Sequence, residues 1–268
     1  MSVRQIDSAK NTYIKYLVKL KDRKARDQEG KFLIEGCKEV SRALDAGVKL
    51  EQVLFCPPFL RAEGELLLHE LGQLELIEVS ADAFTKLSFR QNPDGLMALA
   101  NIKQQSLEEI TLRENALILV IDGLEKPGNV GALLRTADAV NVDAVFLTGQ
   151  GTDIYNPNVI RSSVGSVFSR PILALESAEL INYLKAHQVK LVATSPSATR
   201  SYWHEDYLGA TAIILGTEHD GLAHDWFEAA EAKVRIPMQG MADSLNVATS
   251  GALLLYEVMR QREKIAPS

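Results

Sequence analysis

Short apolar runs alternate with longer amphipathic stretches along most of the chain, and this alternation is typical of an α/β protein. In the second half the apolar runs contain almost no polar residues, which indicates parallel strands covered by helices on both faces of one sheet. Strands are predicted there over residues 116–121, 144–147, 172–175, 190–193, 212–215 and 233–236. A helix is predicted to begin near Val130, after a turn at 123–128.

The last predicted helix, over residues 245–262, is apolar on more than one side. One stripe follows the i, i+4, i+7, i+8, i+11 spacing of a helix face that packs on a core, and its members are Val247, Gly251, Leu254, Leu255 and Val258. Leu253 and Tyr256 lie outside this stripe. Because a monomer would leave their apolar surface in water, we expect a second copy of the chain to cover it in a homodimer.

The first half repeats the α/β alternation in a smaller unit. Its predicted strands are 32–34, 53–56, 76–79 and 95–102, and its predicted helices are 37–46, 62–71 and a short one from 81. Polar residues without a clear period follow at 103–109. We therefore expect a first domain over residues 1–102, a linker over 103–114 and a second domain over 115–268.

Composition narrows the class of protein. Hydrophobic residues make up 46% of the chain and charged residues 24%, which are ordinary values for a soluble globular protein. No run approaches the roughly 18 apolar residues that span a bilayer, and no secretory signal is visible, so we expect a cytoplasmic protein without membrane contact. Cys37, Cys56 and the five histidines show no metal-ligand spacing. We expect no metal site and place both cysteines in the core.

Charge is distributed unevenly along the chain. Residues 1–31 hold nine basic and four acidic groups, a net charge of +5, which leaves −11 for the rest of a chain with −6 overall. The densest part of this basic arm consists of Lys21, Arg23, Lys24 and Arg26. Such an arm on an acidic protein suits contact with a polyanion, and a solvated helix face explains the same pattern equally well.

Common nucleotide-binding and hydrolase motifs are absent. Residues 216–221 have the G-x-x-x-x-G frame of a phosphate loop, but Leu222 and Ala223 follow where Lys and Ser or Thr are required. Residues 149–154 begin a G-x-G-x-x-G motif and lack its third glycine, and no G-x-S-x-G occurs. The sequence therefore disfavours NTP hydrolysis, NAD chemistry and serine hydrolysis.

Three unusual segments remain in the second half, namely NVGALLRTA (129–137), LGTEHDGL (215–222) and IPMQGMADSLNV (236–247). Each has a structural interpretation of its own: Asn129 and Ser244 could be N-caps of the helices that follow, and Glu218 could be a solvated loop residue. Arg135 lies about 140° around its helix from Val130, away from the core stripe, which fits either water or a site.

Together, in this order and spacing, the segments resemble the three motifs of the SpoU (TrmH-like) branch of the SPOUT RNA ribose 2′-O-methyltransferases. The resemblance covers residues 116–262, and KFLIEG (31–36) resembles the entry to an L30e-like RNA-binding domain. It implies a C-terminal parallel-sheet SPOUT domain with a trefoil knot, preceded by a smaller L30e-like α/β domain. Such knots are rare exceptions to ordinary chain topology.

The resemblance also implies a cofactor, S-adenosylmethionine, bound in the knot through main-chain groups at Gly216, Ile236 and Leu245. Glycines let the backbone approach a ligand closely, and apolar side chains offer a wall for adenine. The implied cofactor-binding residues are Gly216, Ile236, Leu245, Leu215 and Met238. An acidic loop is acceptable there because this cofactor carries a sulfonium cation and no phosphate.

The implied reaction is attack of a ribose 2′-oxygen on the cofactor's methyl carbon. The implied catalytic residues are Arg135, Asn129, Glu218, Ser244 and Asn246. The family assigns Arg135 as the base, but a guanidinium accepts protons poorly near neutrality. We therefore expect Arg135 to hold the phosphate beside the target ribose, Asn129 to bind the ribose, Glu218 to orient Arg135, and Ser244 with Asn246 to complete the site.

The expected substrate is 23S ribosomal RNA, and transfer RNA is the alternative. We expect the first domain to hold the RNA, with phosphate contacts from Lys21, Arg23, Lys24 and Arg26. A non-catalytic RNA-binding dimer that keeps the knot would be favoured if the motif residues departed from the family pattern. A Rossmann-type methyltransferase would need a glycine-rich loop after strand 116–121, where DGLEK (122–126) stands instead.

Overall fold

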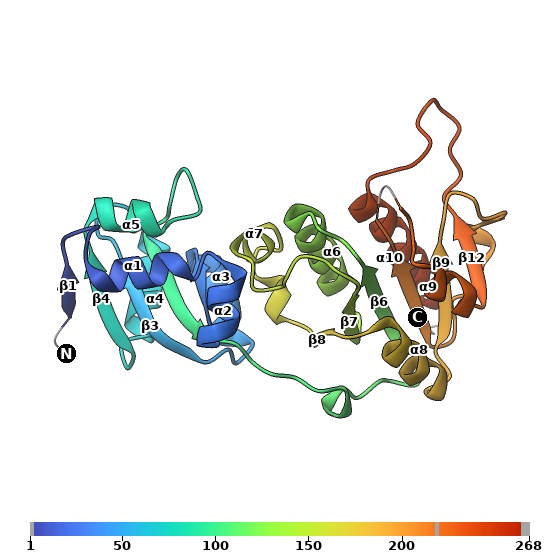
Figure 1. The fold of residues 1–268 in the computed structure, drawn as a ribbon, viewed down its shortest axis with the longest axis horizontal. Helices are drawn as coiled ribbons and strands as arrows, with labels where there is room; N and C mark the ends of the chain where they lie inside the picture. Colours follow the sequence, from blue (N-terminus) through green and yellow to red (C-terminus); the bar gives the residue numbers. More distant parts are fainter. Residues whose placement is uncertain (1–2, 218–219, 264–268) are drawn as a thin grey trace. The chain divides into compact units, whose positions relative to one another are not determined.

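The computed structural model describes residues 3–217 and 220–263, and these fold into two compact units (Figure 1). Unit 1 consists of Met1–Gln104 and Asp153–Ser169, and unit 2 consists of Gln105–Thr152 and Arg170–Ser268. Both are α/β units, as the sequence predicts. Among the described residues, no helix is long and apolar enough to cross a membrane.

Unit 1 is built on a mixed sheet in the order β1-β4-β3-β5-β2. In this sheet β5 runs antiparallel to β2 and β3, while β4 runs parallel to β1 and β3. The strands are β1 (Arg4–Ile6), β2 (Lys31–Glu35), β3 (Leu50–Phe55), β4 (Glu75–Val79) and β5 (Leu96–Asn101). The helices are α1 (Thr12–Lys19), α2 (Arg23–Glu29), α3 (Cys37–Asp45), α4 (Ala62–Glu70) and α5 (Ala81–Leu87).

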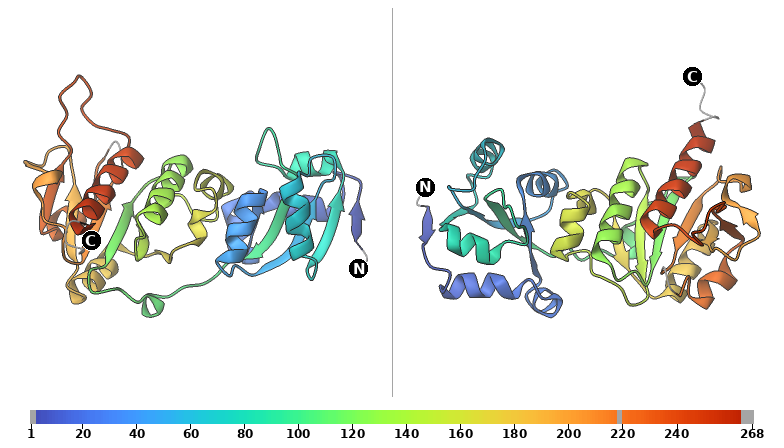
Figure 2. Two further views of the ribbon diagram at one scale, coloured as in Figure 1. Left: turned by 180° about the vertical axis from the view of Figure 1, so that it is seen from behind. Right: turned by 90° about the horizontal axis from the view of Figure 1, so that it is seen from above.

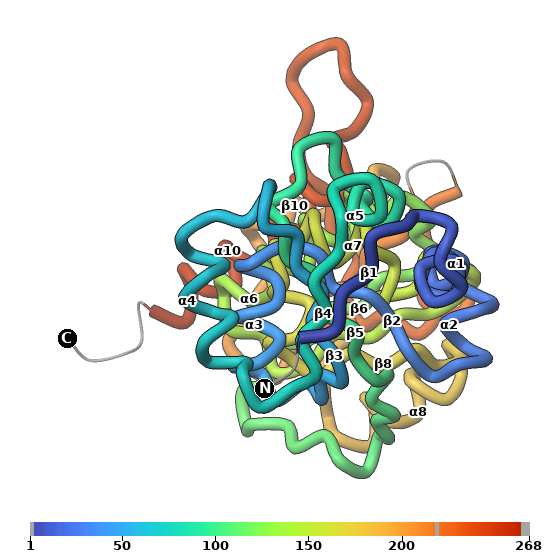
Figure 3. Tube along the Cα trace, turned by 90° about the vertical axis from the view of Figure 1, so that its left-hand side faces the viewer, coloured from blue at the N-terminus to red at the C-terminus, as the bar shows by residue number. Residues whose placement is uncertain are grey.

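The strands of unit 1 lie between α1 on one side and α3 and α4 on the other (Figure 3). On the first side, α1 and α5 enclose an apolar core with the sheet, and its central members are Ile14, Leu17, Leu54, Ile77 and Phe84. All five are fully buried. Cys37 and Cys56 are buried free thiols, as predicted from the sequence.

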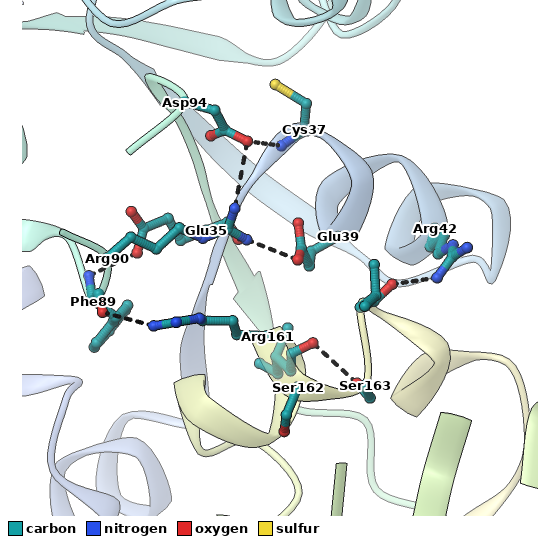
Figure 4. Close-up of polar contacts among 12 residues, drawn as sticks. Glu35, Cys37, Glu39, Arg42, Phe89, Arg90, Asp94, Arg161, Ser162 and Ser163 are labelled. Carbon is teal, nitrogen blue, oxygen red and sulfur yellow. Dashed lines mark hydrogen bonds and ion pairs between the residues drawn. The ribbon is translucent and has the colours of Figure 1, made fainter. Parts of the chain in front are cut away.

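A segment from the second half of the chain completes unit 1. It contains α7 (Pro157–Ser162) and a 3-10 turn, η2 (Ser166–Phe168). Tyr155 packs on Phe32 of β2 with ring centroids 4.5 Å apart, and Arg161 donates to the carbonyl of Phe89 at 3.4 Å (Figure 4). Compactness thus groups Asp153–Ser169 with the N-terminal residues. The limits 1–102, 103–114 and 115–268 stay a prediction for the functional domains.

Arg90 fixes the loop between α5 and β5 in the same unit. It pairs with Glu39 of α3 at 2.7 Å and with Asp94 at 3.7 Å, and it donates to the carbonyl of Glu35 at 2.9 Å (Figure 4). Asp94 in turn accepts from the amide of Cys37 at 3.0 Å. These bonds tie the loop to the start of α3, so its backbone is positioned by charge-assisted contacts.

Unit 2 is built on a sheet in the order β10-β12-β9-β11-β6-β7-β8. Every pairing among these described strands is parallel. The strands are β6 (Leu117–Asp122), β7 (Ala144–Thr148), β8 (Ile172–Ala174), β9 (Lys190–Thr194), β10 (Arg200–Ser201), β11 (Thr211–Leu215) and β12 (Ala232–Arg235). The predicted parallel sheet is confirmed, and the trefoil knot stays a prediction.

Helices cover both faces of this sheet, as the sequence predicts (Figure 2). They are α6 (Pro127–Ala139), α8 (Ser177–Ala186), α9 (His224–Ala229) and α10 (Val247–Glu263), with 3-10 turns η1 (Leu107–Glu109) and η3 (Tyr202–His204). Leu180, Leu184 and Trp226 of α8 and α9 share a core with the strands. On the other face α10 packs on α6 and β11. A Cβ on Gly251 would lie 2.3 Å from the side chain of Leu133 and 2.8 Å from that of Leu215, so both leucines would have to move to admit a larger residue.

Candidate cofactor cavity and active site

A cavity of about 350 Å³ lies in unit 2, at the carboxyl ends of β9, β11 and β12. Ligands in parallel α/β sheets commonly bind outside the carboxyl ends of the strands, and this volume is that of a small-molecule site. The lining residues are 194–197, 215–217, 220, 221, 234–236, 238, 243–245, 247, 250 and 254.

The cavity wall contains every cofactor-binding residue predicted from the sequence. These are Gly216, Ile236, Leu245, Leu215 and Met238. They come from two of the three motif segments, residues 215–222 and 236–247, and Ser244 of the catalytic prediction lies beside them. The structure therefore brings these residues into one wall, and their binding of a cofactor stays a prediction at this point.

The loop after β11 is shaped by its own backbone. Thr217 and Gly221 pair across it, with the amide of Thr217 donating to the carbonyl of Gly221 at 2.9 Å. A Cβ on Gly216 would lie only 2.2 Å from that carbonyl oxygen. Glycine at 216 is thus required first by the loop itself, so a valine there would displace the loop as well as block a ligand. Glu218 lies outside the described residues.

The first and third motifs meet through an amide pair. Asn246 Nδ2 donates to Asn129 Oδ1 at 3.1 Å, and Asn246 Oδ1 accepts from the amide of Ala248 at 2.9 Å. Asn246 therefore caps α10, so the interpretation of Ser244 as that cap is wrong. The interpretation of Asn129 as a cap is also wrong, because α6 begins at Pro127 with Lys126 before it.

Arg135 lies on α6 with its side chain exposed, off the buried stripe of that helix. This confirms the position expected from the helical period. Arg135, Asn129 and Asn246 are not among the residues that line the cavity, whereas Ser244 is. Of the predicted catalytic residues that the structure describes, Ser244 lies in the cavity wall. The other three lie on α6 or at the start of α10.

The sequence reasoning missed the wall formed after β9. Thr194, Ser195 and Ser197 line the cavity, and the amide of Ser195 donates to the carbonyl of Val234 at 3.0 Å. A polar Thr-Ser-Pro-Ser run directly after a predicted apolar strand was the available signal. The wall also carries Asp220 and Asp243. With the apolar residues, these carboxylates suit a ligand that combines an apolar ring with a cationic group.

In unit 1, the prediction that all four residues of the basic cluster contact RNA is not correct. Arg26 is only 2% exposed, donates to the carbonyls of Leu20 and Lys21, and pairs with Asp153 at 2.7 Å. Its guanidinium holds the unit together, so its assignment to RNA contact is wrong. Lys21 donates to two carbonyls and lies 4.7 Å from the ring centroid of Phe89, and burial lowers its pKa.

Arg23 and Lys24 remain exposed on α2, and Lys15 and Lys19 of α1 are exposed as well. The exposed basic surface of this arm therefore extends from α1 to α2, rather than over residues 21–26 alone. Its role in RNA binding stays a prediction.

Comparisons with known proteins agree with this arrangement. Residues 116–256 match the SpoU rRNA Methylase family, and residues 11–98 match the MRM3-like substrate binding domain. A Bacillus subtilis relative named 23S rRNA (guanosine(2553)-2′-O)-methyltransferase RlmP is 33% identical, over 96% of this chain and 99% of its own length.

Solved structures are similar over both halves. One, described as RNA 2′-O ribose methyltransferase, is 49% identical with a TM-score of 0.87, covering 97% of this chain and 99% of its own. The AdoMet-bound rRNA methyltransferase from Sinorhizobium meliloti is 29% identical with a TM-score of 0.88, covering 97% and 98%. The family match spans more than half of the chain, and residues of two of the three motif segments line the cavity. This chain therefore belongs to the SpoU rRNA Methylase family.

Proposed function

We propose that this protein transfers a methyl group from S-adenosylmethionine to a ribose 2′-hydroxyl of 23S ribosomal RNA. One observation carries the proposal: residues of the second and third motifs, separated in sequence, form one cavity at the carboxyl ends of the strands. Relatives named as 23S rRNA 2′-O-methyltransferases and structural neighbours with bound AdoMet support it.

The cavity fits this cofactor in size and chemistry. Ile236, Met238 and Leu245 present an apolar wall for an adenine ring, and the backbone at Gly216 is open to a ligand because no side chain covers it. Asp220 and Asp243 place negative charge in the wall, which favours a cationic ligand. S-adenosylmethionine supplies an activated methyl group on a sulfonium cation, and the residues above would hold it.

The chain's own polar residues would orient the RNA. Asn129, fixed by its bond with Asn246, hydrogen-bonds the target ribose. Arg135, exposed on the same helix, holds the phosphate beside that ribose and stabilises the negative charge that develops on the attacking oxygen. Guanidinium groups are poor proton acceptors, so in this proposal Arg135 acts through charge and position.

Replacing Arg135 tests this function. Arg135→Ala should lower the methylation rate by about 100-fold or more, the usual cost of removing a group that stabilises developing charge. Calorimetry should show unchanged affinity for S-adenosylmethionine, because Arg135 lies outside the cavity wall. Arg135→Lys, which keeps the charge without the planar fork, should retain part of the rate. Full activity of Arg135→Ala on 23S ribosomal RNA would contradict the proposed role.

We also propose that the protein acts as a homodimer through α10. Leu253 and Tyr256 expose 37% and 48% of their surface on this helix, whose opposite side is buried against α6 and β11. Large exposed apolar side chains on a helix packed this way favour a partner, and a second copy is expected because α10 adjoins Asn246 of the proposed active site.

A further inference from the structure

Asp122 is a buried carboxylate that the proposed chemistry does not use. It is the last residue of β6, a central strand that pairs with β11 on one side and β7 on the other, and it is 5% exposed. Its Oδ1 accepts from Thr148 Oγ1 at 2.8 Å, and its Oδ2 accepts from the amide of Ala223 at 3.0 Å. One side chain thus links three neighbouring segments at the carboxyl edge of the sheet.

The bond to Thr148 is part of a directed chain of donors. Trp226 Nε1, fully buried on α9, donates to Thr148 Oγ1 at 3.2 Å, and the threonine hydroxyl donates onward to Asp122. Such chains strengthen each bond in a low-dielectric interior. Among the described residues, the donors to Asp122 are this hydroxyl and the backbone amide of Ala223.

The bond from Ala223 bears on the loop after β11, of which the structure describes residues 216, 217 and 220–223. Its first end is fixed because Leu215 pairs with Ile121 in the sheet, and its second end is fixed where the amide of Ala223 binds Asp122. Between these ends the loop closes on itself, through the Thr217–Gly221 pair. A Cβ on Gly123 would lie 3.3 Å from Thr217, so the loop rests against the turn that follows Asp122.

We propose that Asp122 is a positioning residue, which sets residues 216, 217 and 220–223 of the loop against the sheet and so shapes the cofactor cavity. Four of these described residues line that cavity: Gly216, Thr217, Asp220 and Gly221. Asp122 itself does not line it. The inference rests on the proposed function, since it assigns to Asp122 an effect on S-adenosylmethionine that acts through the loop.

Asp122→Asn tests the inference. The amide keeps one acceptor oxygen and replaces the other with an NH2 donor, so it can no longer accept from both the Thr148 hydroxyl and the Ala223 amide. Loss of a hydrogen bond to a charged group should raise the Kd and the KM for S-adenosylmethionine about tenfold. The amide hydrogen of Ala223 should also exchange faster with solvent. The KM for RNA should stay unchanged, because the RNA-holding residues lie elsewhere.

Asp143→Asn is the matched control. Asp143 also has a 5% exposed side chain and accepts from a backbone amide, that of Leu117 at 2.8 Å, but it lies at the opposite edge of the same sheet. This variant should lose stability without a change in cofactor Kd. If both variants lower the melting temperature and both leave the Kd at the wild-type value, Asp122 is only structural and the inference is wrong.

Thr148→Val covers the case in which Asp122→Asn does not fold. It removes the hydroxyl between Trp226 and Asp122 and leaves the bond to Ala223 in place, so the Kd should rise about threefold, less than for the loss of that bond. An unchanged Kd in Thr148→Val, with Asp122→Asn unfolded, would also overturn the inference. Wild-type protein that binds no S-adenosylmethionine would instead overturn the proposed function, and this inference with it.

Discussion

At the scale of single residues, Glu205 shows how unit 2 keeps a charged side chain inside. Its side chain is 3% exposed and pairs with Lys190 and with Arg200, the latter at 2.5 Å. Burial raises the pKa of the carboxyl, but the hydrogen bonds from the two cations outweigh it, so the net pKa lies below its ordinary value. The charged form is therefore favoured in the folded protein.

Acid should weaken the protein through this residue. A carboxyl whose pKa is lower when folded stabilises the fold above its unfolded pKa of about 4.3, and that contribution is lost as the pH falls below this value. Glu205→Gln should cost about 2 kcal/mol at pH 7 and reduce the loss of stability that occurs as the pH falls below about 4.3. Urea unfolding at a series of pH values measures both, and Glu228→Gln, at an exposed position, is the control. If the variant lost stability at acid pH as steeply as the wild type, this role of Glu205 would be contradicted.

At the scale of elements, the basic N-terminal arm forms two capped helices, α1 and α2. Asn11 accepts from the amide of Tyr13, and Asp22 accepts from the amide of Lys24, so each helix has a side-chain cap. Ile14 and Leu17 of α1 are buried, which turns its lysines outward. Exposure agrees both with RNA contact and with a solvated face, so only a binding measurement separates the two interpretations.

The combined variant Lys19→Ala, Arg23→Ala, Lys24→Ala separates them. It should weaken binding of 23S ribosomal RNA fragments and reduce the slope of log affinity against log salt by about 0.7 to 0.9 for each RNA phosphate that the protein no longer neutralises. Cofactor affinity should not change, since these residues belong to unit 1 and the cavity belongs to unit 2. Lys185→Ala on α8 is the control. A wild-type salt slope in the combined variant would show that these helices are only solvated.

At the scale of the whole molecule, the two units are connected by more than one linker. The chain passes between them at 104/105, 152/153 and 169/170, since residues 153–169 return to unit 1 between β7 and β8. The contacts that hold this segment are specific, as Arg26 pairs with Asp153 and Arg42 donates to the carbonyl of Val164 at 2.5 Å. Each unit therefore contains residues from both halves of the sequence.

Assembly is tested on α10. Leu253→Glu should give a monomer in light scattering, because burying an unpaired charge in an interface costs several kcal/mol. The methylation rate should fall with dimer dissociation, since α10 begins beside Asn246. Leu66→Glu, at an exposed leucine of α4 in unit 1, is the control and should remain dimeric. A wild-type monomer, or a monomeric Leu253→Glu with the full methylation rate, would refute the dimer proposal.

The sequence by itself determined where most strands lie, which class of sheet they form, and which motif residues lie outside the core. Apolar runs located the strands of both sheets except the edge strands β1 and β10, and the near absence of polar residues in the second half indicated a parallel sheet covered on both faces. The helical period placed Arg135 off the core, and the resemblance of the motif segments to a known family implied Gly216 and Ile236, which line the cavity. These features depend on near neighbours in the chain, so they are visible without the fold.

Only the tertiary structure decided which distant residues meet. The pair Arg26 and Asp153 is 127 positions apart, and the pair Asn129 and Asn246 is 117 apart. Arg26 was predicted to contact RNA, but it is buried and its charge is paired with Asp153 inside unit 1. The bond from Ala223 to Asp122 spans 101 positions. No local period encodes such contacts, since they depend on strand order and on how helices pack over the sheet.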